Sequence, residues 1–162
     1  MIRPVKPSDA KAIAHIYNHY ITHSIATFEL DPVNVNEMEK RIKAIHLKYP
    51  YLVYVDKQEV VAYAYASSWK ARKAYQHSVE SSVYLHPEVQ GKGIGSKLYS
   101  ALIDKLKAMD IHAVIGGISL PNKASVALHE KFGFKKIGQF AQVGRKFNQW
   151  IDVGYWELIL DD

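Results

Sequence analysis

The sequence of 162 residues contains no cysteine. Disulfide scaffolds, thiolate zinc sites and cysteine nucleophiles are therefore excluded. The same absence suits a reducing cytosol. No apolar run approaches the length that crosses a bilayer, and Met1 to Pro4 lead into a charged helix rather than into the apolar core of a signal peptide. We therefore expect a cytoplasmic protein.

Long blocks of one charge are also missing. The net charge of +5 is spread along the chain, without the basic stripe interleaved with aromatic residues that marks a nucleic-acid surface. We expect neither nucleic acid nor a membrane as a partner, and an anionic small molecule is the more economical ligand. A hydrophobic share of 48% and a charged share of 23% are ordinary for a globular protein, and the length fits one domain over residues 1–162.

A metal site is not predicted either. His15 and His19 have the i, i+4 spacing of two zinc ligands on one helix face. However, no glutamate completes an H-E-x-x-H motif and no third ligand is evident. We expect no metal cofactor.

Hydrophobic periodicity predicts two helices in the first fifty residues. Ser8 is the expected N-cap of the first helix, and Asn36 with Glu39 resembles a capping box at the start of the second. The apolar stripe of the first helix is Ile13, Ile16, Tyr17, Tyr20 and Ile21.

The rest of the chain alternates β-favouring runs with helical patterns. Asn122 is the expected N-cap of a short helix that ends at Gly133. The predicted strands are residues 52–55, 60–66, 79–85, 113–118, 134–143 and 149–160, and the remaining helix starts at Ile94. This order predicts an α/β fold with a mixed sheet covered by helices.

The run from Gly91 to Gly95 lies between a predicted strand and a predicted helix. Glycines let backbone N–H groups approach a phosphate closely, and the helix dipole favours an anion there. A tight connection without a ligand is the alternative. The turn is no P-loop, because Gly93 follows Gly91-Lys92 where Ser or Thr is required, and it also fails the dinucleotide spacing.

Gln90, Gly93 and Gly95 match the pyrophosphate loop of the GNAT superfamily of N-acetyltransferases, whose pattern is Arg or Gln, any two residues, Gly, any residue, Gly or Ala. This resemblance implies the GNAT fold, with a mixed, mostly antiparallel central sheet flanked by helices, and acetyl-CoA as co-substrate. It assigns the following residues to acetyl-CoA: Val83, Tyr84, Leu85, Gln90, Gly91, Lys92, Gly93, Ile94, Gly95, Ser96, Asn122 and Ser125.

A narrower resemblance is to the phosphinothricin N-acetyltransferase family, which also covers methionine sulfone and methionine sulfoximine acetyltransferases. The matching segments are Asn18-His19-Tyr20, Trp69-Lys70-Ala71-Arg72, residues 80–84, Leu120-Pro121-Asn122, His129-Glu130 and residues 150–154. The resemblance implies a small amino-acid substrate and a homodimer. Phe147 and Asn148 depart from the more usual His-Gly pair of this family.

Two residues are candidates for acid–base catalysis. Glu80, on the strand that the resemblance assigns to acetyl-CoA, can take the proton of the amine directly or through a water molecule. The alternative is a carboxylate that only pairs with Lys70 or Arg72. His129 stands where many GNAT enzymes have a tyrosine, and it can share acid–base duty or merely stabilise its helix.

The strands predicted at residues 52–55 and 60–66 are separated by the polar Asp56-Lys57-Gln58, which indicates a hairpin. The candidate substrate residues follow the second of these strands. Lys70, Arg72 and Tyr75 can hold the anionic groups of an amino acid, although a solvated basic loop has the same composition. Phe28 can add an apolar wall, or it can belong to the core. Because no thiol can carry the acyl group, direct transfer is expected. The competing functions are acetylation of a peptide N-terminus and a non-catalytic acetyl-CoA sensor.

Overall fold

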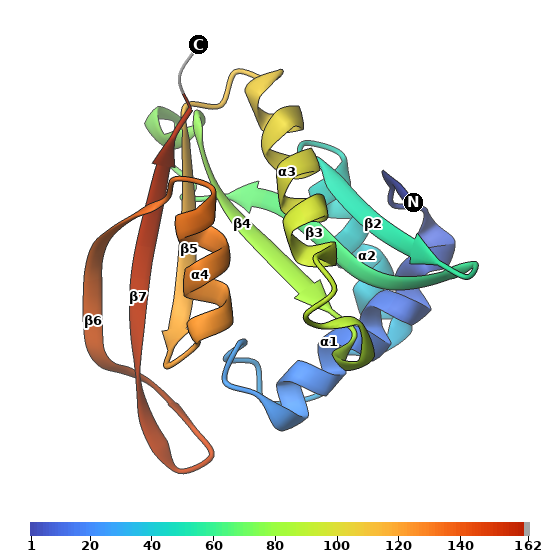
Figure 1. The fold of residues 1–162 in the computed structure, drawn as a ribbon, viewed down its shortest axis with the longest axis horizontal. Helices are drawn as coiled ribbons and strands as arrows, with labels where there is room; N and C mark the ends of the chain where they lie inside the picture. Colours follow the sequence, from blue (N-terminus) through green and yellow to red (C-terminus); the bar gives the residue numbers. More distant parts are fainter. Residues whose placement is uncertain (161–162) are drawn as a thin grey trace. The chain divides into compact units, whose positions relative to one another are not determined.

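The computed structural model describes residues 1–160, which pack into two compact units that interleave along the chain. Unit 1 comprises residues 1–18, 33–67 and 81–110, and unit 2 comprises residues 19–32, 68–80 and 111–160. Helix α1 (Ala10–His23) and strand β4 (Ser78–Leu85) contribute residues to both units (Figure 1).

The strands of unit 1 form an antiparallel arrangement. β1 (Ile2–Pro4) pairs with β2 (Tyr51–Asp56), and β2 pairs with β3 (Glu59–Ser68). Lys57 and Gln58 connect β2 to β3 with φ angles of 48° and 69°, which is the left-handed backbone of a two-residue hairpin. The predicted hairpin is thus confirmed. β1 was not predicted, because three residues ending in proline carry no periodic signal.

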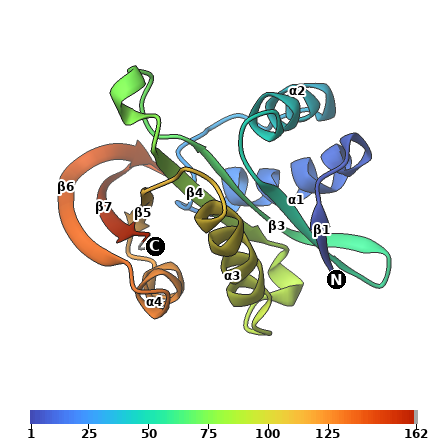
Figure 2. The ribbon, with the colours of Figure 1, turned by 90° about the horizontal axis from the view of Figure 1, so that it is seen from above.

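Two helices cover these strands. α2 (Val35–His46) and α3 (Ile94–Lys107) both contact β2, and Figure 2 shows them on opposite sides of β2 and β3. The apolar stripe of α3 is buried as its 3.6-residue period requires. Its buried residues are Ile94, Leu98, Tyr99, Leu102, Ile103 and Leu106.

Both predicted N-caps in the first part of the chain are wrong. Ser8 lies within a 3-10 turn (Pro7–Asp9), and the Asp9 carboxylate instead accepts hydrogen bonds from the Lys6 backbone N–H and from Arg3. α2 begins two residues earlier than expected, because the Asn34 side chain accepts from the Glu37 N–H at 2.8 Å. Asn34 and Asn36 have the same chemistry, so local sequence alone does not choose between them.

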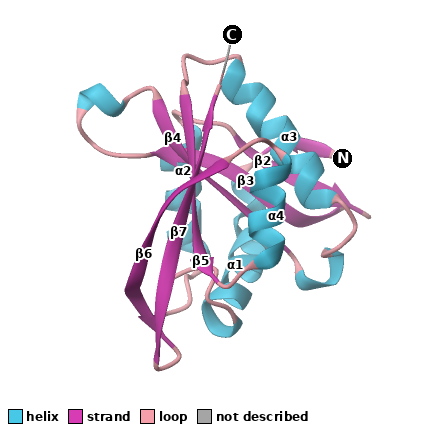
Figure 3. Cartoon of the chain, turned by 60° about the vertical axis from the view of Figure 1, so that its left-hand side comes forward, coloured by secondary structure: helices cyan, strands magenta, loops and turns pink. Residues whose placement is uncertain are grey.

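Unit 2 contains the first residues of β4, then β5 (Ala113–Leu120), β6 (Lys135–Lys146) and β7 (Gln149–Ile159). β4 runs parallel to β5, whereas β5 with β7 and β7 with β6 are antiparallel pairs. α4 (Lys123–Lys131) packs on β5, and Figure 3 shows the long hairpin that β6 and β7 form. The predicted α/β fold with mostly antiparallel strands is confirmed.

None of the helices within residues 1–160 combines the length and the apolar character needed to cross a membrane. Within the same residues, no group of three or more histidine or acidic side chains is arranged to hold a metal ion.

Candidate functional site

Two consecutive glycines in β5 present their bare backbone to opposite faces of the strand, because side chains alternate along a strand. Gly116 is buried, whereas Gly117 is exposed. β5 lies between β4 and β7 in unit 2, so an exposed position there is unusual for a central strand. The face of Gly117 is therefore open to a ligand.

Glu80 borders this open face. It pairs with Ile115 across the parallel β4–β5 ladder, which directs its side chain to the same face as Gly117. A Cβ atom built on Gly117 would lie 3.4 Å from Oε1 of Glu80 and 3.2 Å from Cε1 of Tyr155. Gly117 thus forms a floor without a side chain between a carboxylate and a phenol ring.

The environment of this floor changes how both groups titrate. Burial raises the pKa of Glu80 above its usual range, because the charged carboxylate loses hydration. Burial also raises the pKa of Tyr155, and the negative charge of Glu80 raises it further. The phenol therefore stays protonated, and the carboxyl group is tuned to bind and release a proton closer to neutral pH than a solvated glutamate.

Aromatic rings extend the wall beside Tyr155. Its ring makes edge-to-face contacts with Trp69 at 5.9 Å and with Phe140 at 5.8 Å between ring centroids. The Lys70 ammonium lies 5.4 Å from the centroid of Trp69, so it is linked to this wall by a cation–π contact. Lys70 is thereby connected to the neighbourhood of Glu80 through two aromatic side chains.

The other predicted substrate residues are Arg72 and Tyr75, in the connection between β3 and β4, and Phe28, whose ring packs against β6. Arg72 and Tyr75 are exposed at the start and end of a 3-10 turn (Lys73–Tyr75 after Arg72). Phe28 is 39% exposed, and its ring lies directly over Gly144 of β6, where a Cβ would come within 2.3 Å of the ring. Phe28 is thus neither a core residue nor a free surface side chain.

His129 lies on the other face of β5. A Cβ built on Gly116 would meet its Nε2 atom at 2.5 Å, and the histidine is only 5% exposed. Its Nδ1 lies 2.7 Å from the Ser125 carbonyl oxygen, which can only accept, so Nδ1 carries the hydrogen. Burial lowers the pKa of His129, although the bond to Ser125 opposes this change. His129 and Glu80 therefore occupy opposite faces of β5.

The start of α4 is built as the sequence predicts. The Asn122 side-chain oxygen accepts a hydrogen bond from the Ser125 N–H at 3.1 Å, which confirms Asn122 as the N-cap. Gly133 ends the helix region with a φ angle of 90°. Asn122, Ser125 and His129 are consequently joined in one chain of hydrogen bonds along α4.

In unit 1, the glycine turn adopts the backbone that only glycine takes easily. Gly91 and Gly93 both have φ angles of 77°, and no atom lies within 4 Å of a Cβ built on either of them. Gly93 is the N-cap of α3, so the first N–H groups of this helix, which have no acceptor within the helix itself, lie beside an uncrowded turn that also carries Lys92. The geometry fits an anion such as a pyrophosphate.

The remaining predicted acetyl-CoA residues of unit 1 lie on either side of this turn. Val83, Tyr84 and Leu85 are the last residues of β4, and the Tyr84 ring packs edge-on against Tyr17 at 5.4 Å. Ile94, Gly95 and Ser96 form the first turn of α3, after Gln90.

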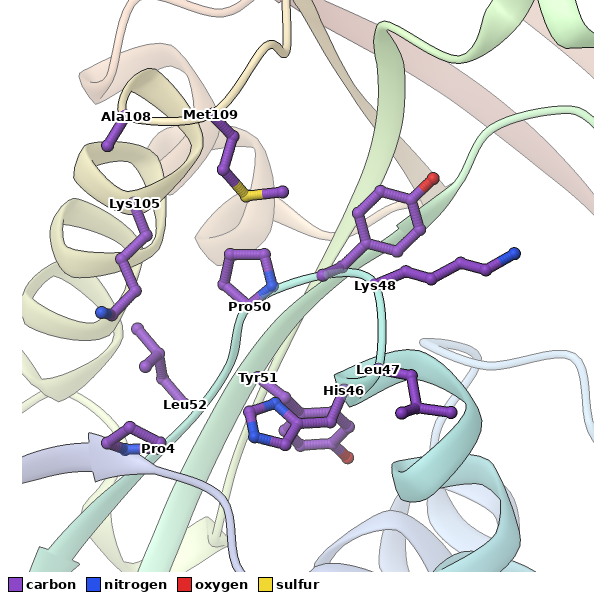
Figure 4. A pocket seen from close by; sticks show the side chains of 11 residues that line it. Pro4, His46, Leu47, Lys48, Pro50, Tyr51, Leu52, Lys105, Ala108 and Met109 are labelled. Atoms are coloured by element: carbon purple, nitrogen blue, oxygen red, sulfur yellow. The ribbon is translucent and has the colours of Figure 1, made fainter.

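A separate pocket of about 370 Å³ in unit 1 contains none of the predicted site residues. It is bounded by the end of α2, the start of β2 and the end of α3 (Figure 4). Lys48, Lys105 and His46 supply its charged and titratable groups, and no carboxylate lines it. This pocket therefore offers no carboxylate as a base for acyl transfer.

Sequence reasoning gave no site role to Gly117, Trp69 and Tyr155, although Trp69 stands in a segment that carries the family resemblance. The only available signal was the Gly116-Gly117 pair inside an apolar strand, because glycine in a strand often marks a close approach of a ligand or another backbone. Tyr155 is distant in sequence from Glu80 and approaches it through the pairing of β4, β5 and β7. Trp69, in the connection after β3, joins this group through its ring contact with Tyr155.

The chain is similar to known acetyltransferases along most of its length. The family model described as an acetyltransferase (GNAT) domain matches residues 2–154. Phosphinothricin N-acetyltransferase of Streptomyces coelicolor is 39% identical over 160 residues, covering 96% of this chain and 94% of that protein. L-Methionine sulfoximine/L-methionine sulfone acetyltransferase of Salmonella typhimurium is 38% identical over 162 residues, with coverages of 99% and 95%.

A solved structure agrees with these relatives. A GNAT superfamily phosphinothricin acetyltransferase from Sinorhizobium meliloti, in complex with acetyl-CoA, superposes with a TM-score of 0.96 at 35% identity. The match covers 99% of this chain and 88% of that one.

Proposed function

Because the chain belongs to the GNAT acetyltransferase family and is an acetyl-CoA-dependent N-acetyltransferase, we propose that it acetylates the α-amine of small amino-acid-like acceptors. Phosphinothricin, methionine sulfoximine and methionine sulfone are the acceptors to which its relatives point. The observation that carries this proposal is the Glu80 carboxylate at the edge of the open floor of Gly117. A desolvated carboxylate beside an exposed glycine, which has no side chain of its own, is suited to an amine.

Bound acetyl-CoA supplies the thioester whose acetyl group is transferred. The turn from Gln90 to Gly95 is the proposed pyrophosphate site, because its left-handed glycines leave the N–H groups of the α3 N-terminus uncrowded. The end of β4, Ser96 in α3, and Asn122 with Ser125 in α4 are the further proposed contacts. No cysteine exists to carry an acyl intermediate, which supports direct transfer to the amine.

Glu80 is the proposed general base. An α-ammonium group must lose a proton before its nitrogen can attack a carbonyl carbon. The raised pKa of Glu80, caused by burial, makes its carboxylate a stronger base than that of an exposed glutamate. The proton passes from the amine to a carboxylate oxygen, directly or through one water molecule.

Acceptor recognition is assigned to the basic connection and its aromatic wall. Lys70 and Arg72 would bind the carboxylate and the second anionic or polar group of the acceptor, with Tyr75 beside them. The Lys70–Trp69–Tyr155 chain of contacts supports this assignment, because it connects a cation to the wall that borders Glu80. Phe28 is the proposed apolar wall for the acceptor's side chain.

His129 has a narrower proposed role than Glu80. With its hydrogen held by the Ser125 carbonyl, the neutral ring presents Nε2 as an acceptor only. Donating a proton to a departing thiolate first requires protonation of the ring, which the lowered pKa opposes. We assign the base function to Glu80 because its carboxylate borders the exposed Gly117, whereas Nε2 of His129 lies against the buried Gly116 on the opposite face of β5. His129 is proposed to share acid–base duty only as a proton acceptor through Nε2.

A homodimer is the proposed assembly, and the β6–β7 hairpin is its proposed interface. This hairpin carries several exposed large apolar side chains, which are Ile137, Phe140, Val143, Phe147 and Trp150. An edge strand with such side chains is a ready surface for a second copy. Sedimentation equilibrium should give twice the chain mass, and Trp150→Glu should shift the protein toward the monomer.

An amine panel tests the proposed function. Thiol release from acetyl-CoA is measured with L-methionine sulfoximine, L-methionine sulfone, L-phosphinothricin, their D-enantiomers and a set of peptides. We expect turnover with the L-amino acids and little with the peptides. Turnover with peptides alone would establish N-terminal acetylation instead, and binding of acetyl-CoA without turnover of any amine would favour the sensor.

A further inference from the structure

Lys146 is a buried lysine that the reaction described above does not use. It lies at the end of β6, a strand in which only Gly144 and Lys146 are buried. The Lys146 residue is 3% exposed. Burying an ammonium group is costly unless its hydrogens are all bonded. The arrangement around Lys146 therefore calls for an explanation.

The three hydrogens of the ammonium group are directed to one segment of chain. Nζ of Lys146 donates to the carbonyl oxygens of Ser24 at 2.7 Å, Thr27 at 2.8 Å and Tyr20 at 3.4 Å. Tyr20 belongs to the last turn of α1, where a cation also complements the helix dipole. One side chain thus ties together the helix end and the turn that follows it.

The same segment is folded by two hydroxyl groups. The Ser24 hydroxyl accepts from the Ala26 N–H at 3.0 Å, and the Thr27 hydroxyl accepts from the Glu29 N–H at 3.2 Å. These local bonds shape the turn, but they do not attach it to the sheet. Lys146 attaches the turn to β6.

Phe28 directly follows Thr27, whose carbonyl oxygen accepts a hydrogen bond from Lys146 at 2.8 Å. Its ring lies over Gly144, which shares a face of β6 with Lys146 because the two residues are two positions apart. A Cβ on Gly144 would lie 2.3 Å from Cε2 and 2.4 Å from Cζ of Phe28, so only glycine admits the ring. Residues 144 and 146 therefore fix both the ring and the backbone that carries it.

We propose that Lys146 is a positioning residue for acceptor specificity: it holds residues 20–27 so that Phe28 rests on Gly144 as the apolar wall of the acceptor site. The inference rests on the proposed function, in which Phe28 contacts the acceptor. Lys146 itself does not touch the acceptor. Its loss should therefore affect the amine and leave acetyl-CoA alone.

A double-mutant cycle of steady-state kinetics tests this inference. Lys146→Met keeps the apolar stem but removes the donors, and it should raise KM for L-methionine sulfoximine about tenfold with KM for acetyl-CoA unchanged. Phe28→Ala should do the same. In the Phe28→Ala background, Lys146→Met should then have no further effect on KM for the amine. Lys135→Met, an exposed lysine of the same strand, is the matched control and should change nothing.

The outcomes separate this inference from the proposed function. Additive effects of Lys146→Met and Phe28→Ala, or equal effects on both substrates, would overturn the positioning role alone. An unchanged amine KM in Phe28→Ala would overturn the acceptor role of Phe28 and the inference with it. Absence of turnover with every amine would reject the proposed function. Amide hydrogen exchange would then test by itself whether Lys146 holds residues 20–27. Lys146→Met should speed exchange of the Ala26 and Glu29 amides at least about tenfold, and unchanged exchange would overturn the inference.

Gly144→Ala asks the same question without touching the lysine. Its methyl group would displace the Phe28 ring, so KM for the amine should rise as in Lys146→Met. Gly138→Ala is the matched control, because no atom lies within 4 Å of a Cβ at this glycine of the same strand. Equal KM values for the amine in the two glycine variants would contradict the role of the contact between Phe28 and Gly144. This pair also serves if Lys146→Met fails to fold.

Discussion

Gly116 and Gly117 are adjacent glycines on opposite faces of β5, and their surroundings differ. On one face, Gly116 is covered by a buried imidazole whose hydrogen is fixed by a backbone carbonyl. On the other, Gly117 is exposed and bordered by Glu80 and Tyr155. The same absence of a side chain permits close packing on the first face and leaves room for a ligand on the second. The difference is that the His129 ring covers Gly116, whereas Gly117 stays exposed.

Replacing the carboxylate of the open face should have the largest effect. Glu80→Gln keeps the shape but cannot accept the proton, so kcat should fall on the order of 10² to 10³ fold, with acetyl-CoA affinity retained. Glu157→Gln is the control, because Glu157 pairs with the same Ile115 from the β7 side. Steady-state kinetics with L-methionine sulfoximine measure both. A kcat within a few fold of the parent, or an unchanged pH–rate profile, would remove Glu80 as the base.

Adding a methyl group on the closed face should mainly cost stability. In Gly116→Ala the new Cβ meets the His129 ring, which cannot move freely because it is buried and bonded to Ser125. We expect urea unfolding to show a loss of about 1–3 kcal/mol in the free energy of unfolding. His129→Ala should relieve the clash, so the double variant should be more stable than the sum of the two changes predicts. Strict additivity would contradict direct packing.

The same methyl group on the open face should mainly cost affinity for the amine. In Gly117→Ala the Cβ contacts Tyr155 at 3.2 Å and Glu80 at 3.4 Å, so small shifts accommodate it. The free energy of unfolding should change by less than about 1 kcal/mol. KM for the amine should rise about fivefold to tenfold, because the methyl group would occupy the proposed acceptor site. Equal stability losses in Gly116→Ala and Gly117→Ala would break the comparison between the faces.

The smallest expected effect is a dependence of stability on pH. The folded-state pKa of Glu80 is raised, so its contribution to stability is fully present below the unfolded-state pKa and is lost as pH rises through the folded one. Glu80→Gln should therefore stabilise the fold at pH 8, by less than about 1 kcal/mol, and should not do so at pH 4. Parallel urea titrations at the two pH values measure this difference. A larger gain at pH 4 would contradict a desolvated carboxylate.

Much of the fold was predictable because its signals are local. The strands near residues 79–85 and 113–118, the Asn122 cap and the Gly133 helix end follow from periodicity and capping chemistry, and the structure confirms them. The caps at Ser8 and Asn36 were wrong because a neighbouring residue, Asp9 or Asn34, offered equivalent oxygen atoms. Local chemistry identifies a helix start only within a few residues.

The sequence by itself determined the family, the glycine turn and the identity of Glu80 as a candidate base, because these depend on motifs read along the chain. Only the tertiary structure decided that Glu80 and His129 lie on opposite faces of β5 and that Tyr155, with Trp69 against its ring, borders the exposed Gly117. It also decided that Lys146 reaches back to residues 20–27. For Glu80 and Tyr155 the physical reason is strand pairing, because the register of β4, β5 and β7 brings together residues whose separation in sequence carries no local signal. Lys146 and Trp69 meet their partners through long-range side-chain contacts, which carry no local signal either.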